Sequence, residues 1–456
     1  MPVNSESSRS ALRQTARVVL PLMAATFIGT SCDFVSSFFS ARHSNGVLCA
    51  ALPASAVAMT FVSVLSTIIA LSGTFFARAH GAGYSARALS AFRQGLLLAM
   101  MTIPLFLLAV PVGDLLFETF AHEPTIHALE RTLYRFQLGG GFCLVLFTAL
   151  SGFLSGQGRT RFLSAASIAG CLTAALTASL LINGCGSFPA LGVHGLGLAV
   201  LFGKTLPCLL LLIPLLRDPL FKSARWSDWL RPDRSMLLDI LRQGIPAGLS
   251  VLVLSGTFTA FTLVIGRLDT LSVTAINICF ALNGFYWVFV QAAEQAVTIL
   301  VGRALGAKDV RGANVALRQT AGILLIPLTL FFAFCLTCTD LVTRLLYDTK
   351  SGIDFAVLRS TVRFILMVFV VRDILEAGCH LIGGVLTAAL DTRALLVIRL
   401  AANAVWIMLL GAAFAFKPTL AAYVALTPIQ MALVLVPLLV RWYREPSWRR
   451  SPLFDD

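Results

Sequence analysis

A single acid near the middle of an apolar segment is the first feature of this sequence that suggests chemistry. Asp33 lies in Pro21–Arg42, PLMAATFIGTSCDFVSSFFSAR, which is long enough to cross a lipid bilayer. An ionised carboxylate at the bilayer centre costs about 2.5–3.5 kcal/mol, so acids at that depth usually mark an ion or substrate path. A structural acid bound by nearby hydroxyl or backbone groups is the alternative. We take Asp33 as the leading functional residue, able to bind a proton or to act as a Na⁺ ligand.

A second group of ionisable residues lies in an apolar run nearer the C-terminus. Asp373, Glu376 and His380 are three and four residues apart, a spacing that places side chains on one face of a helix. Such a row suits a proton relay, because histidine titrates close to physiological pH. The alternative is a structural network in which Arg372 neutralises an acid. The spacing leaves both interpretations open.

The apolar run near residues 272–302 contributes polar and aromatic side chains that suit a binding cavity. Tyr286 and Trp287 present ring faces that attract a flat organic cation. Glu294 adds an acid, for which pairing with an arginine is the alternative. We predict a substrate site built from residues of these two runs: Glu376, Glu294, Asn277, Asn283, Tyr286, Trp287 and Gln291.

These residues require elements that hold them inside a membrane, and the composition provides such elements. Of the 456 residues, 57% are hydrophobic and 12% are charged, whereas about 25% of residues are charged in soluble domains. Apolar runs of about 20 residues recur along the chain, without the polar alternation of barrel strands. The sequence predicts an all-α integral membrane protein with about twelve transmembrane helices. They fall near residues 16–41, 47–77, 91–118, 132–156, 161–183, 192–216, 238–266, 272–302, 317–346, 356–388, 392–415 and 418–441.

The formal net charge of +13 does not indicate nucleic-acid binding, because of where the charges lie. Basic residues gather before the first run, in alternate loops, and after the last run at Arg441 and Arg444, while the loop 183–194 has no Lys or Arg. By the positive-inside rule both termini are cytoplasmic and the number of spans is even.

The second half of the chain repeats the first. ARAHGAGYSARALSAFRQ (77–94) matches GRALGAKDVRGANVALRQ (302–319) at an offset of 225, and GFLSGQGRTR (152–161) matches GVLTAALDTR (384–393) at 232. We predict two pseudo-symmetric six-helix bundles, related by an axis along the membrane normal and enclosing a central cleft. The paired glycines Gly81 and Gly306 suit tight turns between helices. The predicted domains are 1–216, a cytoplasmic linker 217–237, 238–441 and a cytoplasmic tail 442–456.

At these residues the sequence resembles the multidrug and toxic compound extrusion (MATE) family of transporters. The resemblance rests on Pro21, Asp33, GFLSGQGRTR and several later segments: LRQGIPAGL (241–249), VTILVGRALGAKD (297–309) and RDILEAGCHLIGGVLTAALDTR (372–393). It implies a V-shaped pair of bundles that exports organic cations in exchange for Na⁺ or H⁺. It also implies that Asp33 and Asp373 are the ion-coupling acids, since they fall at the family's first-helix and tenth-helix positions.

The sequence therefore predicts a secondary active multidrug exporter that works by alternating access, and not an enzyme. One alternative is a lipid-linked oligosaccharide flippase of the same superfamily. A more distant alternative is an intramembrane lipid-modifying enzyme, which would need clustered catalytic residues that the six scattered histidines do not provide. We expect small organic cations as substrates, Na⁺ or H⁺ as coupling ion with no other cofactor, a monomer, and the bacterial inner membrane as location.

Overall fold

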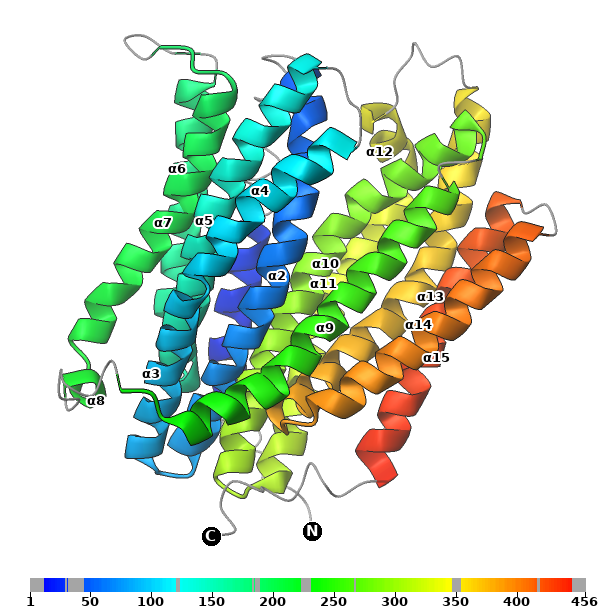
Figure 1. The fold of residues 1–456 in the computed structure, drawn as a ribbon. Helices are drawn as coiled ribbons and strands as arrows, with labels where there is room; N and C mark the ends of the chain where they lie inside the picture. The colour runs from blue at the N-terminus through cyan, green and yellow to red at the C-terminus, as the bar shows by residue number, and fades with distance from the viewer. Residues whose placement is uncertain are drawn as a thin grey trace. The chain divides into compact units, whose positions relative to one another are not determined.

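The structure, a computed structural model, describes residues 12–28, 31, 45–119, 124–182, 184, 189–222, 231–265, 268–346, 354–415 and 419–444. All regular secondary structure in these ranges is helical, which confirms the all-α prediction (Figure 1). Ten helical segments within the described residues are long and apolar enough to cross a membrane. α13 is longer than most of them, but three charged residues lie close together in it, Arg372, Asp373 and Glu376.

Residues 12–28 are helical, and the labelled helices follow in order. They are α2 (Asn45–Gly81), α3 (Ser85–Met101), α4 (Ile103–Thr119), α5 (Pro124–Gly156), α6 (Thr160–Leu181), α7 (Val193–Leu216), α8 (Pro219–Lys222), α9 (Arg234–Ile265), α10 (Thr270–Gly306), α11 (Val310–Thr337), α12 (Thr339–Leu346), α13 (Phe355–Ala388), α14 (Thr392–Ala415) and α15 (Leu420–Arg444).

Two of the predicted spans are each broken into two helices. The span predicted near 91–118 consists of α3 and α4, which are separated at Thr102. Pro104 follows within the first turn of α4, and its missing N–H leaves one helical hydrogen bond unmade. At the break, the hydroxyl of Thr102 donates to the carbonyl oxygen of Ala99 at 2.7 Å. The span predicted near 317–346 is likewise divided into α11 and α12.

The helix bounds repeat at the two offsets found in the sequence. α2 and α10 begin 225 residues apart (270 − 45) and also end 225 apart (306 − 81). α6 and α14 begin 232 apart (392 − 160). Backbone conformation repeats as well. Gly83 (φ 82°) corresponds to Lys308 (φ 57°), and Gly158 (φ 78°) corresponds to Leu390 (φ 63°). The internal repeat therefore extends to single residues in the turns.

The chain divides into two compact units, which are described separately. The N-terminal unit comprises Leu20–Gly248 and Gly302–Asp309, and the C-terminal unit comprises Met1–Val19, Leu249–Val301 and Val310–Asp456. The predicted domain boundaries stay a prediction.

Helices of the N-terminal unit pack closely through glycines. α2 packs against α5, α5 against α7, and α6 against α7. A Cβ on Gly73 of α2 would lie 2.8 Å from the Cα of Gly152 in α5, so neither position has room for a side chain. Small residues at helix contacts are the usual way in which membrane helices gain close packing.

Gly81 and Gly306 allow close contact between helices. The left-handed turn lies two residues later in each case. A Cβ on Gly81 would lie 2.2 Å from the carbonyl oxygen of Arg303. A Cβ on Gly306 would lie 2.0 Å from the carbonyl oxygen of Arg78. The two contacts are related by the 225-residue offset, so the ends of α2 and α10 meet reciprocally. Any side chain at either glycine would separate them.

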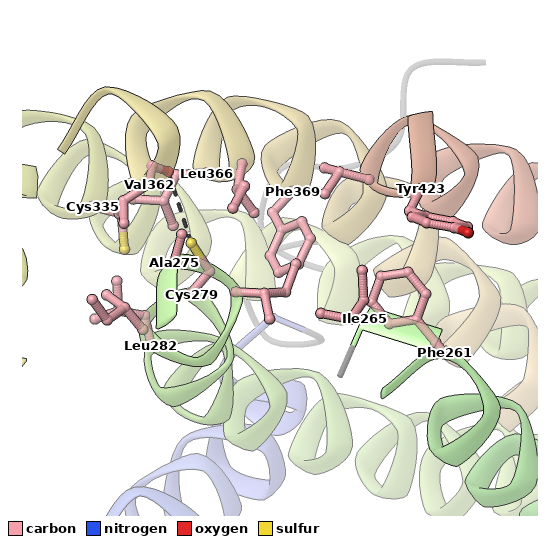
Figure 2. Close-up of a cluster of buried hydrophobic side chains, with 14 of the residues drawn as sticks. Phe261, Ile265, Ala275, Cys279, Leu282, Cys335, Val362, Leu366, Phe369 and Tyr423 are labelled. Carbon is pink, nitrogen blue, oxygen red and sulfur yellow. Dashed lines mark hydrogen bonds between the residues drawn. The ribbon is translucent and has the colours of Figure 1, made fainter. Parts of the chain in front are cut away.

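The core of the C-terminal unit is an apolar cluster to which α9, α10, α11, α13, α14 and α15 all contribute (Figure 2). Phe261 and Phe369 lie within it, and Cys279 donates its thiol to the carbonyl oxygen of Val362 at 3.8 Å. This cluster fixes α10 against α13, the two helices that carry most of the predicted site residues.

Candidate functional site

The polar residues of α10 and α13 form a buried cluster in the C-terminal unit. On α13, Asp373, Glu376 and His380 are all buried, as their spacing on one helical face suggests. On α10, Asn283, Tyr286 and Glu294 are separated by three and eight residues, which also places them near one face. Because the two faces meet, residues about 90 positions apart in the sequence become hydrogen-bond partners.

Asp373 is the centre of this cluster, with an exposed fraction of 1%. Its Oδ1 accepts a hydrogen bond from Nη1 of Arg372 at 3.1 Å, and its Oδ2 accepts one from Nδ2 of Asn283 at 2.9 Å. Nη2 of Arg372 lies 2.9 Å from Oε2 of Glu376. Arg372 therefore holds both acids of α13, with its side chain packed over the ring of Phe369.

Tyr286 connects the cluster to the main chain of α13. Its hydroxyl donates to the carbonyl oxygen of Asp373 at 2.6 Å, and the residue is fully buried. Beside it is a narrow pocket that has Asn283 and Asp373 on its polar side. Its other lining residues are apolar or sulfur-containing: Cys279, Leu282, Phe331, Phe332, Cys335, Leu366, Phe369 and Val370. The carboxylate of Asp373 therefore borders a small, mostly apolar pocket.

Glu294 pairs with a histidine, not primarily with an arginine. Its Oε2 lies 2.6 Å from Nδ1 of His380, whose ring meets the ring of Trp287 edge to face at a centroid distance of 4.8 Å. A Cβ on Gly383 would lie 3.3 Å from Nη2 of Arg399 and 3.6 Å from Oε1 of Glu294. The absence of a side chain at Gly383 leaves this space to the charged groups.

Two of the predicted substrate residues are not among the bonded residues of the cluster. Asn277 is exposed on α10, and Gln291 is half-buried on the same helix, three residues before Glu294. Asp33 lies outside the described residues. The remaining predicted residues are brought together around Arg372 and His380.

Several polar residues that the fold places near this cluster were not among the predicted site residues. Asn403 on α14 and Gln430 on α15 are buried, and the amide of Gln430 donates to Oδ1 of Asn403 at 2.8 Å. Arg399 is also buried. Arg399 and Asn403 lie four residues apart on α14, and polar residues inside a span are usually functional or paired. That signal was present in the sequence, but it does not identify partners.

The arrangement can bind one cation. With both acids ionised, Arg372, Asp373 and Glu376 carry a net charge of −1 (1 − 2). Buried charge is tolerated when it is compensated, so one proton or one monovalent ion would neutralise the group. Carboxylate and amide oxygens are ligands that hard cations prefer. The neighbouring pair of Glu294 and His380 is a further site that can hold a proton.

Comparisons with known proteins agree on one family. The family model described as MatE matches residues 21–180 and 246–413. The chain is 28% identical over 338 residues to a protein named probable multidrug resistance protein NorM from Synechococcus, covering 72% of this chain and 73% of the relative. It is 27% identical over 319 residues to multidrug resistance protein PmpM from Pseudomonas aeruginosa, covering 68% and 65%.

Solved structures show the same fold. One is an outward-facing multidrug resistance MATE family transporter of the MOP superfamily, with a TM-score of 0.86, 19% identity, and coverage of 96% of this chain and 97% of that one. Another is a MOP superfamily transporter from Pyrococcus furiosus, with a TM-score of 0.84, 18% identity and the same coverage. The two matches to the family model begin 225 residues apart (246 − 21), the offset of the internal repeat.

Proposed function

Because this chain belongs to the MatE family of transporters, we propose that it is a secondary active multidrug exporter. In this proposal it exchanges organic cations for Na⁺ or H⁺ by alternating access. The names of its relatives, multidrug resistance proteins NorM and PmpM, support export of several unrelated compounds.

The observation that carries this proposal is the buried cluster in which one arginine, Arg372, bridges two acids, Asp373 and Glu376. Antiport requires a site that either the coupling ion or the organic cation can occupy, but not both. A carboxylate group with one uncompensated charge meets this requirement, because Na⁺ or H⁺ cancels the charge that attracts the substrate. The ion pair with Arg372 holds Asp373 in place at 3.1 Å, while Asn283 orients its second oxygen.

Other residues have supporting roles in the proposal. Glu376 shares the charge of Arg372, and Glu294 with His380 provides a second protonatable pair. Tyr286 fixes the main chain beside Asp373, and Trp287 presents an aromatic surface. Asp33 is proposed to be the coupling acid of the first span, and Asn277, Asn283 and Gln291 to contact substrate.

We further propose that the protein works as a monomer in the bacterial inner membrane, with both termini in the cytoplasm. The distribution of Lys and Arg supports this orientation. The twelve-span pattern supports it too, because an even number of spans returns the chain to its starting side.

Ethidium efflux from proteoliposomes tests the proposal. A Na⁺ gradient and a pH gradient are imposed separately on vesicles that contain wild-type protein, Asp33→Asn or the control Lys222→Gln, which changes an exposed residue of α8. We expect one gradient to drive efflux in the wild type and the control, but not in Asp33→Asn. Efflux driven by neither gradient would refute the exporter proposal. Normal efflux by Asp33→Asn would remove that residue from the mechanism.

A further inference from the structure

Two acids of α13 share one arginine, and the sharing is unequal. Glu376 is four residues after Arg372, a spacing at which side chains are neighbours on a helix, whereas Asp373 is the next residue and does not face it. Arg372 nevertheless donates from Nη1 to Oδ1 of Asp373 at 3.1 Å. Its Nη2 lies 2.9 Å from Oε2 of Glu376, but Oε2 makes no hydrogen bond with another described residue. The guanidinium is thus bonded to the acid that its position on the helix favours less.

Nη1 of Arg372 occupies a place that would suit a small cation. It donates to Oδ1 of Asp373 on α13 and, at 3.3 Å, to Oδ1 of Asn283 on α10. Nδ2 of Asn283 donates to the second carboxylate oxygen of Asp373 at 2.9 Å, which fixes the direction of the amide. Two oxygens from different helices therefore converge on one point of positive charge. Carboxylate and amide oxygens are the ligands that hard cations prefer.

A guanidinium that leaves Asp373 has a second partner within the cluster. The side chain of Arg372 is only 11% exposed, and it packs over the ring of Phe369 at 5.2 Å from the ring centroid. Its Nη2 is already beside Glu376. A small movement along α13 would turn this close approach into a full ion pair, without exposing the guanidinium to water.

The charges of the cluster then balance for a monovalent ion. With both acids ionised, one monovalent cation at Asp373 and Arg372 at Glu376 form two neutral pairs. A divalent cation at the same place would leave a charge of +1 (2 + 1 − 2). Buried charge is tolerated when it is compensated, so this arrangement favours the monovalent ion.

We propose that Arg372 is a tethered competitor of the coupling ion. Its guanidinium holds the place between Asp373 and Asn283, moves to Glu376 when a monovalent cation binds there, and returns when the ion leaves. This inference rests on the proposed export function and names the residue that sets the affinity and the valence of its coupling ion. The returning guanidinium spares the protein a bare buried carboxylate, so it assists release of the ion.

Ion binding to purified full-length protein tests this inference. Binding of radiolabelled Na⁺ is measured at high pH, and proton uptake is measured by potentiometric titration without Na⁺. Each curve is compared with that of the same protein carrying Asp373→Asn, so that the difference reports binding at Asp373. The readout is the concentration of Na⁺ or of protons at which this difference is half-maximal.

The subtraction is needed because other ionisable groups surround Asp373. Charged or titratable side chains of the packed helices are Arg372, Glu376 and His380 on α13, Cys279, Tyr286 and Glu294 on α10, Cys335 on α11, Asp340 and Arg344 on α12, Arg399 on α14, and Tyr423, Arg441 and Arg444 on α15. All of them remain in the Asp373→Asn version of the wild type.

The double variant Arg372→Gln/Glu376→Gln separates a competitor from a residue that only positions Asp373. It removes the guanidinium and its second partner, and the net charge of the cluster stays at −1. We expect half-saturation at about one-tenth of the wild-type concentration, which corresponds to about 1.4 kcal/mol. An arginine that only holds the carboxylate in place would give the opposite sign, because its loss would weaken binding.

Glu376→Gln tests the second partner. The change leaves Arg372 and Asp373 as a neutral pair, in which every remaining charge is compensated, so this variant should fold even if the double variant does not. We expect it to bind the ion at least about tenfold more weakly than the wild type, since the guanidinium has no other acid to move to. Arg359→Gln is the matched control, because it removes an arginine of the same helix that pairs with Asp340 where both are about half exposed. It should leave half-saturation unchanged.

The outcomes distinguish this inference from the proposed function. Binding by the double variant that is no tighter than that of the wild type would overturn the inference, as would wild-type affinity in Glu376→Gln or no ion binding at Asp373. In those cases ethidium efflux driven by one of the two gradients would leave the exporter proposal standing. If neither ion binds at Asp373 and neither gradient drives efflux, both fail together.

Discussion

Replacing Arg372 with Met should destabilise the protein far more than replacing an arginine at the surface would. The change leaves Asp373 and Glu376 as two uncompensated carboxylates, whose side chains are 2% and 4% exposed. Breaking a buried ion pair by removing one partner costs about 3–5 kcal/mol. Asp373→Asn should cost less, about 1.5–3 kcal/mol, because Arg372 keeps Glu376 as its partner.

The double variant Arg372→Met/Asp373→Asn gives the decisive comparison. It leaves Glu376 as the one charge of the group, so the net charge returns to −1. We expect it to be more stable than Arg372→Met alone, with a coupling free energy within the range of about 0.5–3 kcal/mol found for contacting residues.

Thermal melting of the wild type, the two single variants and the double variant in one detergent measures this double-mutant cycle. Arg359→Met is a matched control on the same helix, because Arg359 pairs with Asp340 where both side chains are about half exposed. Exposed pairs contribute about 0–1 kcal/mol, so its melting temperature should hardly change. If the effects of the two single changes simply add, or if Arg359→Met is as harmful as Arg372→Met, the buried ion-pair account is wrong.

Four further changes test three features of the fold, each by thermal melting. Lys308→Gly should stabilise the protein by about 0.5–1 kcal/mol, because Lys308 is exposed and has a φ of 57°. Gly83→Ala at the equivalent position of the first repeat should destabilise the protein. Effects of the opposite sign would exclude backbone strain at these positions. Asp269→Ala should cost about 1 kcal/mol, because its carboxylate caps α10 by accepting from the backbone N–H and hydroxyl of Ser272. The hydrogen bond from the Ser272 hydroxyl lowers the pKa of Asp269. The stability that the cap contributes is therefore complete above the ordinary pKa of 3.8 and is lost as pH falls through the lowered pKa. If the melting temperature of the wild type falls no more than that of the variant in this range, the cap is refuted. Tyr286→Phe should cost about 0.5–1.5 kcal/mol, since it removes a buried hydrogen bond to the main chain of α13; no loss would mean that this bond is not formed.

The helices could be predicted closely because their signal is local. Apolar runs set the spans, and the offsets of 225 and 232 residues reappear in the bounds of α2 with α10 and of α6 with α14. The break at Thr102 was missed, since an apolar run continues through Pro104 and hydropathy does not register a missing N–H.

Partners of the polar residues could be predicted only within one helix. The spacing of Asp373, Glu376 and His380 correctly indicated one buried face. It did not indicate that His380 pairs with Glu294, because that contact depends on how α10 is rotated against α13. An apolar core shared by six helices sets that rotation, and no single segment encodes it.

Lys204 shows the opposite failure, in which a local signal was present and was not used. A lysine in the middle of an apolar run is as unusual as Asp33, and the same cost argument applies to both.

The claim that one excess negative charge is shared between coupling ion and substrate is tested most directly by ethidium binding to purified protein. Binding is measured as Na⁺ is added and, separately, as pH is lowered, with wild type and Asp373→Asn side by side. The account predicts that one of the two ions displaces ethidium from the wild type, and that Asp373→Asn binds ethidium at least about tenfold more weakly, without dependence on that ion. Equal affinity and equal ion dependence in the two proteins would contradict it.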